Sequence, residues 1–444
     1  MRKMKDSGIE WIGEIPEEWE IVKTLYVLIM PITDGPHTTP ELFDEGIPFV
    51  SAEAVSCGNG QIDFNHIRGY ISKEFYDECC KKYIPKINDI YMIKSGATTG
   101  KVALVNTNRV FTIWSPLAVF RCDEQKMNYK YLYYTLQADY YLKQIETKWS
   151  FGTQQNIGMR VLEQLRICFP SMPEQQKISA FLDRKCSEID SVTAKTKATI
   201  EEYKKLKQAI ITQAVTKGIR KGRKMKDSGV EWIGEIPEEW ELRPFRHILK
   251  ERNEKNYPIK STERLSLSIE LGVTLYSEKT TNLDRFKDDF EEYKLAHIGD
   301  LVMNSMNMIV GATGVSDYYG CVSPIYYTFY DENENHITAK FCEYIFRSKA
   351  MLRVLYSMGK GIYAIVRGDD RVNTCRLKVA KEDLKSLLLP IPSLDEQQEI
   401  IDYIYKKCAA IDTLIAKKEQ LLTELENYKK SVIYEYVTGK KEIG

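Results

Sequence analysis

The sequence is poor in the features that mark membrane, secreted and metal-binding proteins. Its 444 residues contain no run of about eighteen apolar residues, and the polar start MRKMKDSG differs from a signal peptide. The ten cysteines form no C-x-x-C pair and only five histidines are present, so a zinc site is not expected. We therefore expect a cytoplasmic protein with free thiols, without a metal or cofactor and without membrane contact.

An excess of charge of one sign is also missing. Sixty-three Lys and Arg residues balance 63 Asp and Glu residues, so any affinity for nucleic acid has to come from local patches or from partners. The hydrophobic fraction of 43% and the charged fraction of 28% are typical of globular proteins. The length allows two to four domains, at about 100–200 residues per domain.

The sequence contains two tandem copies of one framework. A tag at residues 2–20, RKMKDSGIEWIGEIPEEWE, recurs at residues 223–241 with one substitution, Ile9 against Val230. Further matches lie 222 residues apart: Glu174-Gln175-Gln176 with Glu396-Gln397-Gln398, Cys186 with Cys408, Ile189-Asp190 with Ile411-Asp412, and Val215-Thr216 with Val437-Thr438. Each copy therefore consists of a tag, a middle region of about 150 residues and a terminal segment.

The terminal segments predict two long helices. Pro173 and Pro392 stand before the predicted starts, and Gly218 and Gly439 follow the ends. With Leu182 as heptad position a, the first seam comprises Leu182, Ile189, Thr196, Tyr203 and Ile210 at a, and Lys185, Val192, Thr199, Leu206 and Gln213 at d. The second comprises Ile404, Ile411, Lys418, Leu425 and Val432 with Lys407, Leu414, Leu421, Tyr428 and Glu435. We expect the helices to pair as an antiparallel coiled coil with an internal pseudo-two-fold axis; two amphipathic helices on separate domains are the alternative.

The middle regions predict α+β domains. Strand-like runs at 89–93, 102–105 and 325–329 are separated by turn residues, and helix-like stretches follow at 130–145 and 340–356. The two middles diverge, although Asp89-Ile90 with Gly96-Ala97-Thr98 has an echo in Asp300-Leu301 with Gly311-Ala312-Thr313. The repeated framework implies two equivalent docking faces for two copies of one partner, and the divergent middles imply two different targets.

Three motifs together resemble the specificity subunit of type I restriction–modification systems. They are the tag, the stretch Asp34-Gly35-Pro36-His37 with Gly46-Ile47-Pro48-Phe49 after it, and the Pro-x-x-Glu-Gln-Gln start of each helix. The resemblance implies a first target recognition domain at residues 1–172, a spacer helix at 173–218, a second recognition domain at 219–394 and a second spacer helix at 395–439. The motif Asp34-Gly35-Pro36-His37 has no counterpart in the second middle region.

The resemblance also implies a function. Such a subunit binds a bipartite, asymmetric double-stranded DNA target with one half-site per recognition domain. It docks two methyltransferase subunits and, through them, two restriction/translocase subunits, and it has no catalytic residues or cofactor of its own. The loop at residues 96–102 only partly resembles a phosphate-binding loop, because Val102 stands where a Ser or Thr is needed. The alternative function is a coiled-coil scaffold for protein interactions that binds no nucleic acid.

Polar and basic loops supply the candidate DNA contacts, since Arg, Lys, Asn and Gln bind base edges and phosphates. The candidates are Lys94, Thr98, Lys101, Thr153, Gln154, Gln155 and Asn156 in the first domain, and Asn304, Asn307, Lys360, Tyr363, Arg367 and Arg371 in the second. A basic run, Lys217, Arg220, Lys221, Arg223, Lys224 and Lys226, is interpreted either as a phosphate contact or as a solvated linker. The tag residues Trp11, Ile12, Ile15 and Trp19, with Trp232, Ile233, Ile236 and Trp240, predict a structural role, with partner docking as the alternative.

Overall fold

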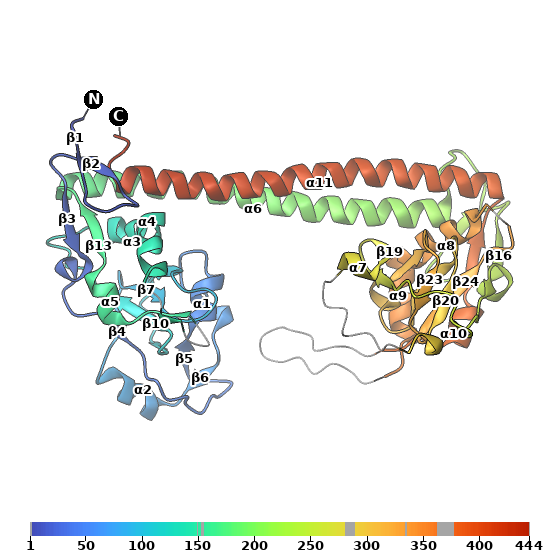
Figure 1. The fold of residues 1–444 in the computed structure, drawn as a ribbon, viewed down its shortest axis with the longest axis horizontal. Coiled ribbons are helices and arrows are strands. Elements are labelled where there is room, and N and C mark those ends of the chain that lie inside the picture. Colours follow the sequence, from blue (N-terminus) through green and yellow to red (C-terminus); the bar gives the residue numbers. More distant parts are fainter. Residues whose placement is uncertain are drawn as a thin grey trace. The chain divides into compact units, whose positions relative to one another are not determined.

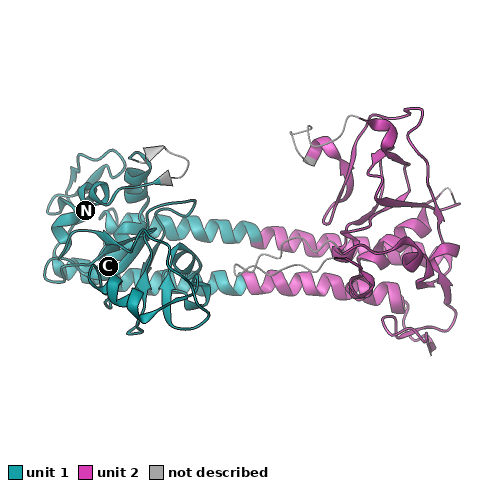
Figure 2. Cartoon of the chain, turned by 90° about the horizontal axis from the view of Figure 1, so that it is seen from below, with its two compact units in different colours: residues 1–196, 419–444 teal, residues 197–418 magenta. Residues whose placement is uncertain are grey.

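A computed structural model describes residues 2–148, 150–151, 155–279, 289–333, 335–361 and 377–443. The chain divides into two compact units (Figure 2). Unit 1 comprises Met1–Thr196 with Glu419–Gly444, and unit 2 comprises Lys197–Lys418. Each unit holds one tag, one mixed domain and segments of both long helices. Within the described ranges, every helix is too short or too polar to cross a membrane.

The first copy of the framework runs from β1 to the first long helix (Figure 1). Its elements are β1 (Met4–Asp6), β2 (Glu14–Pro16), β3 (Glu20–Lys23), η1 (Thr24–Val27), β4 (Thr33–Asp34), β5 (Ile47–Val50), α1 (Ala52–Cys57), η2 (Phe64–His66), β6 (Tyr70–Ile71), α2 (Lys73–Cys80), β7 (Ile90–Ile93), β8 (Val102–Leu104), β9 (Thr112–Ile113), β10 (Leu117–Phe120), α3 (Tyr129–Gln137), α4 (Asp139–Glu146), β11 (Ser150–Phe151), β12 (Gln155–Asn156), α5 (Met159–Gln164), β13 (Arg166–Phe169) and α6 (Met172–Lys217).

The second copy ends on the other long helix. Its elements are β14 (Met225–Asp227), β15 (Glu235–Pro237), β16 (Glu241–Pro244), η3 (Phe245–His247), β17 (Lys250–Glu251), β18 (Leu265–Ser268), β19 (Gly272–Leu275), α7 (Tyr276–Lys279), η5 (Phe290–Glu292), β20 (Lys294–Ala296), β21 (Leu301–Asn304), η6 (Met308–Val310), β22 (Thr313–Val315), β23 (Gly320–Val322), β24 (Tyr326–Tyr330), α8 (Ile337–Arg347), α9 (Lys349–Met358), α10 (Lys381–Ser386), β25 (Leu388–Ile391) and α11 (Leu394–Val437).

The same antiparallel sheet forms the centre of each mixed domain. Its strand order is β4-β10-β7-β8 in unit 1 and β17-β24-β21-β22 in unit 2. The apolar strands β7 and β21 are buried along their whole length, as expected for central strands of a sheet covered on both faces. The mixed helix and strand content predicted from the sequence is confirmed. The two predicted helices at 130–145 and 340–356 are each divided, because Ala138 and Ser348 adopt extended backbone angles.

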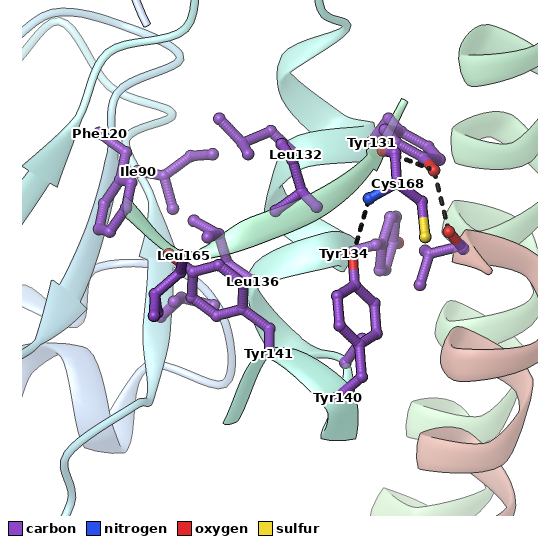
Figure 3. Close-up of a cluster of buried hydrophobic side chains, with 14 of the residues drawn as sticks. Ile90, Phe120, Tyr131, Leu132, Tyr134, Leu136, Tyr140, Tyr141, Leu165 and Cys168 are labelled. Carbon is purple, nitrogen blue, oxygen red and sulfur yellow. Dashed lines mark hydrogen bonds between the residues drawn. The ribbon is translucent and has the colours of Figure 1, made fainter. Parts of the chain in front are cut away.

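Tyrosines fill much of the core of unit 1 (Figure 3). Tyr131 and Tyr140 are completely buried, so their hydroxyl groups need internal partners. The Tyr131 hydroxyl donates to the carbonyl of Val437 at the end of α11 (3.0 Å), and the Tyr140 hydroxyl accepts from the Cys168 amide (3.4 Å). Burial raises the pKa of both phenols, which stay protonated at neutral pH. The last turn of α11 therefore completes the core that begins with the first tag.

The buried stripe of each long helix differs from the predicted seam by one position. Four of the predicted seam residues are exposed by 43–49%: Val192, Leu206, Leu414 and Tyr428. In α6 the buried stripe instead follows Leu182, Cys186 and Ile189, a step of four and then three residues. In α11 it follows Ile404, Cys408 and Ile411 in the same way. Residues repeated every seven positions, such as Leu182 and Ile189, belong to the stripe in either register. The register is decided by whether the buried residue between them lies three or four positions after the first.

Glycine ends both long helices as predicted. Gly218 and Gly439 follow α6 and α11 with φ angles of 72° and 70°, the left-handed conformation that glycine adopts without strain. A Cβ on Gly439 would lie 2.5 Å from the ring of Pro16, which leaves no room for a side chain. Pro173 lies inside the first turn of α6 rather than before it, where its missing amide hydrogen costs nothing.

The equivalent glutamines near the helix starts allow a matched test of the fold. Gln175 accepts a hydrogen bond from the Asn128 amide (2.7 Å) and donates to the Pro170 carbonyl (2.9 Å), whereas Gln397 donates to the Pro392 carbonyl (3.0 Å) and its Oε1 atom has no partner. We predict that Gln175→Ala destabilises its unit by about 1–3 kcal/mol, because the Asn128 amide is left unpaired. Gln397→Ala should cost less.

Hydrogen exchange measured by mass spectrometry distinguishes the two units and gives the free energy of opening in each. In Gln175→Ala the amide exchange rate should increase around Asn128. In Gln397→Ala the rate around α8 should increase by less. Equal effects of the two substitutions would contradict the prediction that the side chain of Gln175 contributes more to stability than that of Gln397.

Candidate nucleic-acid interface

A hairpin rests on the β7–β8 turn in unit 1. Strands β11 and β12 pair through Ser150 and Asn156, and Asn156 also forms a β-bridge with Ser95 at the start of the turn. The Ile157 amide donates to the Lys94 carbonyl (2.9 Å). Ser95 and Asn156 are far apart in sequence and paired in the fold. The structure therefore places Asn156, one residue of the second predicted group, beside the turn that holds Lys94, Thr98 and Lys101.

Unit 2 repeats this arrangement with a different loop. Lys360 forms a β-bridge with Lys378, and the Val379 amide donates to the Ser305 carbonyl (3.0 Å) after β21. Val379 lies 222 residues after Ile157, so it is the structural counterpart of that residue. The intervening segment is longer here, because the paired residues are 18 positions apart instead of six. The two units thus share the hydrogen bond that anchors the end of this segment, but the segment differs in length.

A buried carboxylate–arginine pair holds each central sheet below these turns. Asp89 before β7 accepts two hydrogen bonds from Arg121 (2.7 and 2.8 Å), and Asp300 before β21 accepts two from Arg252 (2.6 and 3.1 Å). Both aspartates are 1% exposed, so removing the arginine would leave a buried carboxylate without its main partner, which is strongly destabilising. Hydrogen bonding to Asp89 raises the pKa of Arg121. The two arginines follow different strands, β10 and β17, and the sequence offers no signal for their pairing.

The predicted contact Lys94 belongs to an internal charge cluster. Its ammonium group lies 3.4 Å from a carboxylate oxygen of the fully buried Asp34, which also pairs with Lys82 and lies 3.2 Å from the exposed His37 ring. Gly35 is required beside it, because a Cβ would lie 2.0 Å from the Ile113 carbonyl oxygen. This explains the motif Asp34-Gly35-Pro36-His37 as a structural one that presents His37 and Lys82 to solvent.

The other predicted residues of unit 1 differ in exposure. Lys101 is exposed, and no ion pair of it occurs among the residues that the structure describes. Thr98 is half-buried in the turn, while Asn156 is exposed on the hairpin. Gln155 belongs to β12, and nothing further is described for its side chain. Thr153 and Gln154 lie outside the described residues.

In unit 2 the described candidates have unequal roles. Asn304 is buried, and its side-chain oxygen accepts from the Met306 amide (3.0 Å), which stabilises the turn after β21. Asn307 in that turn is exposed, and the exposed Lys360 pairs with Asp383 (3.1 Å). Tyr363, Arg367 and Arg371 lie outside the described residues.

Three residues of the predicted basic run, Arg220, Arg223 and Lys226, have internal partners. Arg220 forms two hydrogen bonds with Glu399 (2.8 and 2.9 Å), and Arg223 pairs with both Glu239 and Glu396. Hydrogen bonding to Glu396 raises the pKa of Arg223. Arg223 therefore joins the second tag to the start of α11, and Arg220 joins the segment before this tag to the same helix. Among the described residues, no group of three His, Cys, Asp or Glu side chains could hold a metal ion.

The buried cysteines lack the character of nucleophiles. Burial raises the pKa of Cys168 to about 12 and that of Cys186 to about 11. A thiol is nucleophilic only as the thiolate, and at neutral pH these two groups remain protonated. They act as small apolar side chains in the core of unit 1.

The chain is similar in sequence and fold to proteins of type I restriction–modification systems. Residues 16–202 match the family model of the type I restriction modification DNA specificity domain. A protein of Methanocaldococcus jannaschii provisionally described as the type I restriction enzyme MjaX specificity subunit is 26% identical over 97% of this chain and 95% of its own length. The type I restriction enzyme MjaVIII specificity subunit of the same organism is 21% identical over 96% and 93%. A solved structure of a type I restriction–modification system has the same fold, with a TM-score of 0.66, 13% identity and coverage of 96% and 99%.

The exposure of Lys101 and the burial of Lys94 give opposite predictions. Lys101→Ala should weaken duplex DNA binding about three- to tenfold at low salt and lower the salt-dependence slope by about one, because one phosphate contact is lost. Its thermal stability should not change. Lys94→Met should instead destabilise unit 1 by about 1–3 kcal/mol, because Asp34 loses a buried cation.

Fluorescence anisotropy titrations at several salt concentrations measure the slope, and Lys3→Ala on the exposed tag serves as the control. An unchanged slope in Lys101→Ala would mean that this lysine contacts no phosphate.

Proposed function

Because the chain belongs to the specificity subunits of type I restriction–modification systems, we propose that it binds a bipartite, asymmetric DNA target with one half-site in each recognition domain. The recognition domains correspond to residues 1–172 and 219–394, and the spacer helices to 173–218 and 395–439. One observation carries the proposal: the same anchor, Ile157 on Lys94 and Val379 on Ser305, follows segments of different length and sequence in the two units. A shared anchor with unlike loops suits two half-sites of unlike sequence.

The two long helices are proposed to pair as an antiparallel coiled coil with an internal pseudo-two-fold axis. Two ion pairs support this arrangement. Inside unit 1 Lys429 of α11 contacts Asp190 of α6 (2.7 Å), and inside unit 2 Lys207 of α6 contacts Asp412 of α11 (2.7 Å). The lysines are 222 residues apart, as are the aspartates, so each helix supplies the same two charges to the other. Such pairs fix the register of paired helices more than their stability.

The repeated framework is proposed to dock two methyltransferase subunits, which in turn recruit two restriction/translocase subunits. The framework is the part of the chain that recurs with one substitution in 19 tag residues, whereas the recognition domains diverge. Two copies of one partner need the same surface twice. The chain itself is proposed to be non-catalytic, so methylation and cleavage require these partners.

Exchange of one recognition domain tests the assignment of half-sites. Replacing residues 20–172 with the corresponding residues of another family member should change one half of the methylated sequence and leave the other half and the gap unchanged. Methylation mapping of a genome that expresses the hybrid with its methyltransferase gives the target directly. A change in both halves, or in neither, would refute the assignment.

Lengthening the helices tests their role as spacers. Inserting one heptad after residue 198 and one after residue 420 keeps the buried stripe in register and adds roughly 10 Å at 1.5 Å per residue. The gap between the half-sites should grow by about three base pairs at 3.4 Å each.

A single insertion, in α6 alone, is the matched control and should abolish specific methylation, because the paired stripes no longer match. A gap that is unchanged by the double insertion would show that the helices do not set the spacing.

A further inference from the structure

The tag contacts the long helix differently in the two units. In unit 1 the hydroxyl group of Tyr434 on α11 donates to the backbone carbonyls of Trp11 (3.1 Å) and Ile12 (3.2 Å). The equivalent residue on α6, 222 positions earlier, is Thr212. Its shorter side chain leaves its hydroxyl group buried and without a hydrogen-bond partner in unit 2. A tyrosine thus closes the gap between tag and helix in one copy only.

A cavity of about 610 Å³ lies at this place in unit 2. Its walls are one face of α6 around Thr212, the tag residues Trp232 and Ile233, and the first turn of α9. Such a volume is typical of sites that bind a side chain or a small ligand. Trp232 is half-buried and supplies an apolar wall, while the opposite wall is polar.

The cavity carries an uncompensated positive charge. Four cationic side chains line it and no Asp or Glu does: Lys205, Lys217, Lys349 and Arg353. All four are exposed, and none of them forms an ion pair within the described part of the chain. In unit 1 the helix position equivalent to Lys205 holds the neutral Asn427. Asp139, the first residue of α4, stands where Lys349 begins α9. Lys143, the fifth residue of α4, stands where Arg353 stands on α9, so this cation is common to both units. The larger positive charge of unit 2 favours an anionic ligand.

The apolar wall of the cavity restricts the class of ligand further. Trp232 and Ile233 of the tag line the cavity together with the four cations. A DNA backbone offers phosphates but no apolar side chain that could cover such a wall, whereas a peptide offers carboxylates and apolar side chains together. The pairing of four cations with an apolar wall therefore favours an acidic peptide over nucleic acid.

We propose that the cavity beside Thr212 binds an acidic segment of the methyltransferase subunit. In this arrangement an Asp or Glu carboxylate of the segment lies among the four cations, and an apolar side chain of the same segment packs against Trp232. The inference rests on the proposed function, in which that subunit is the partner of the framework. It makes the two docking faces unequal, since Tyr434 already occupies the equivalent place in unit 1.

Filling the cavity tests the proposal with a residue that the fold already accommodates in unit 1. Thr212→Tyr in the full chain should weaken the binding of one of two methyltransferase copies at least tenfold and leave the other copy unaffected. Isothermal titration without DNA measures both affinities, and sedimentation gives the stoichiometry. Glu202→Tyr, on the exposed face of the same helix, is the matched control and should bind both copies as the unmodified chain does.

Reversing the charge provides a second variant that leaves the cavity open. Lys349→Glu combined with Arg353→Glu changes two exposed side chains, so folding should be preserved, and it should cause the same tenfold loss. Lys406→Glu combined with Lys417→Glu, both exposed on α11, is the control.

The outcomes separate this inference from the function on which it rests. Unchanged methyltransferase binding in both cavity variants would overturn the inference and leave the proposed function standing. Unchanged methyltransferase binding with weakened binding of duplex DNA would overturn it in favour of a phosphate site. If the unmodified chain binds no methyltransferase subunit at all, the proposed docking function itself is wrong and the inference fails with it.

Discussion

Both units depend on a buried tag tryptophan that lies between the start of one long helix and the end of the other. In unit 1 the Trp19 indole donates to Glu174 at the start of α6 (2.9 Å), and a Cβ on Gly439 after α11 would lie 3.1 Å from the same ring. In unit 2 Trp240 occupies the equivalent place, and a Cβ on Gly218 after α6 would lie 3.1 Å from it. Each unit is thus built from segments distant in sequence, and neither core is complete without both helices.

This constraint explains why the tag hardly varies between the copies while the middle regions do. A change at the tryptophan or at the terminal glycine disturbs the tag, the start of one long helix and the end of the other. A change in a loop beyond the central sheet disturbs only that loop. The sheet needs a carboxylate before its central strand and an arginine to pair with it. Arg121 and Arg252 meet that need from different strands, so the anchor is preserved while the chain around it diverges. The same aspartate–arginine pair can therefore support recognition domains with different loops.

Much of the fold follows from the sequence because it depends on periodicity. The long helices, their terminal glycines and the central strands are all set by patterns within one segment. The seam register was wrong although the signal was present: the position three residues after Leu182 and Ile404 is a lysine in both copies, and the position four residues after is a cysteine. A lysine in a buried stripe is costly, so the cysteines mark the inner face. The break at Ala138 has no such signal, since no proline or glycine stands there.

The candidate site was less predictable because its residues are defined by contacts between segments. Lys94 and Lys101 flank the same turn and look alike in the sequence, yet one pairs with buried Asp34 and the other is exposed. Only the position of Asp34 on β4, which β10 separates from β7 in the sheet, distinguishes the two lysines. The same holds for the two faces where tag and helix meet, which the repeat predicts to be equivalent. A single difference, Tyr434 against Thr212, alters the contact between tag and helix, so two nearly identical tags border surfaces of different shape and charge. Sequence repeats establish a common frame, and the few positions that differ within it decide what each copy can bind.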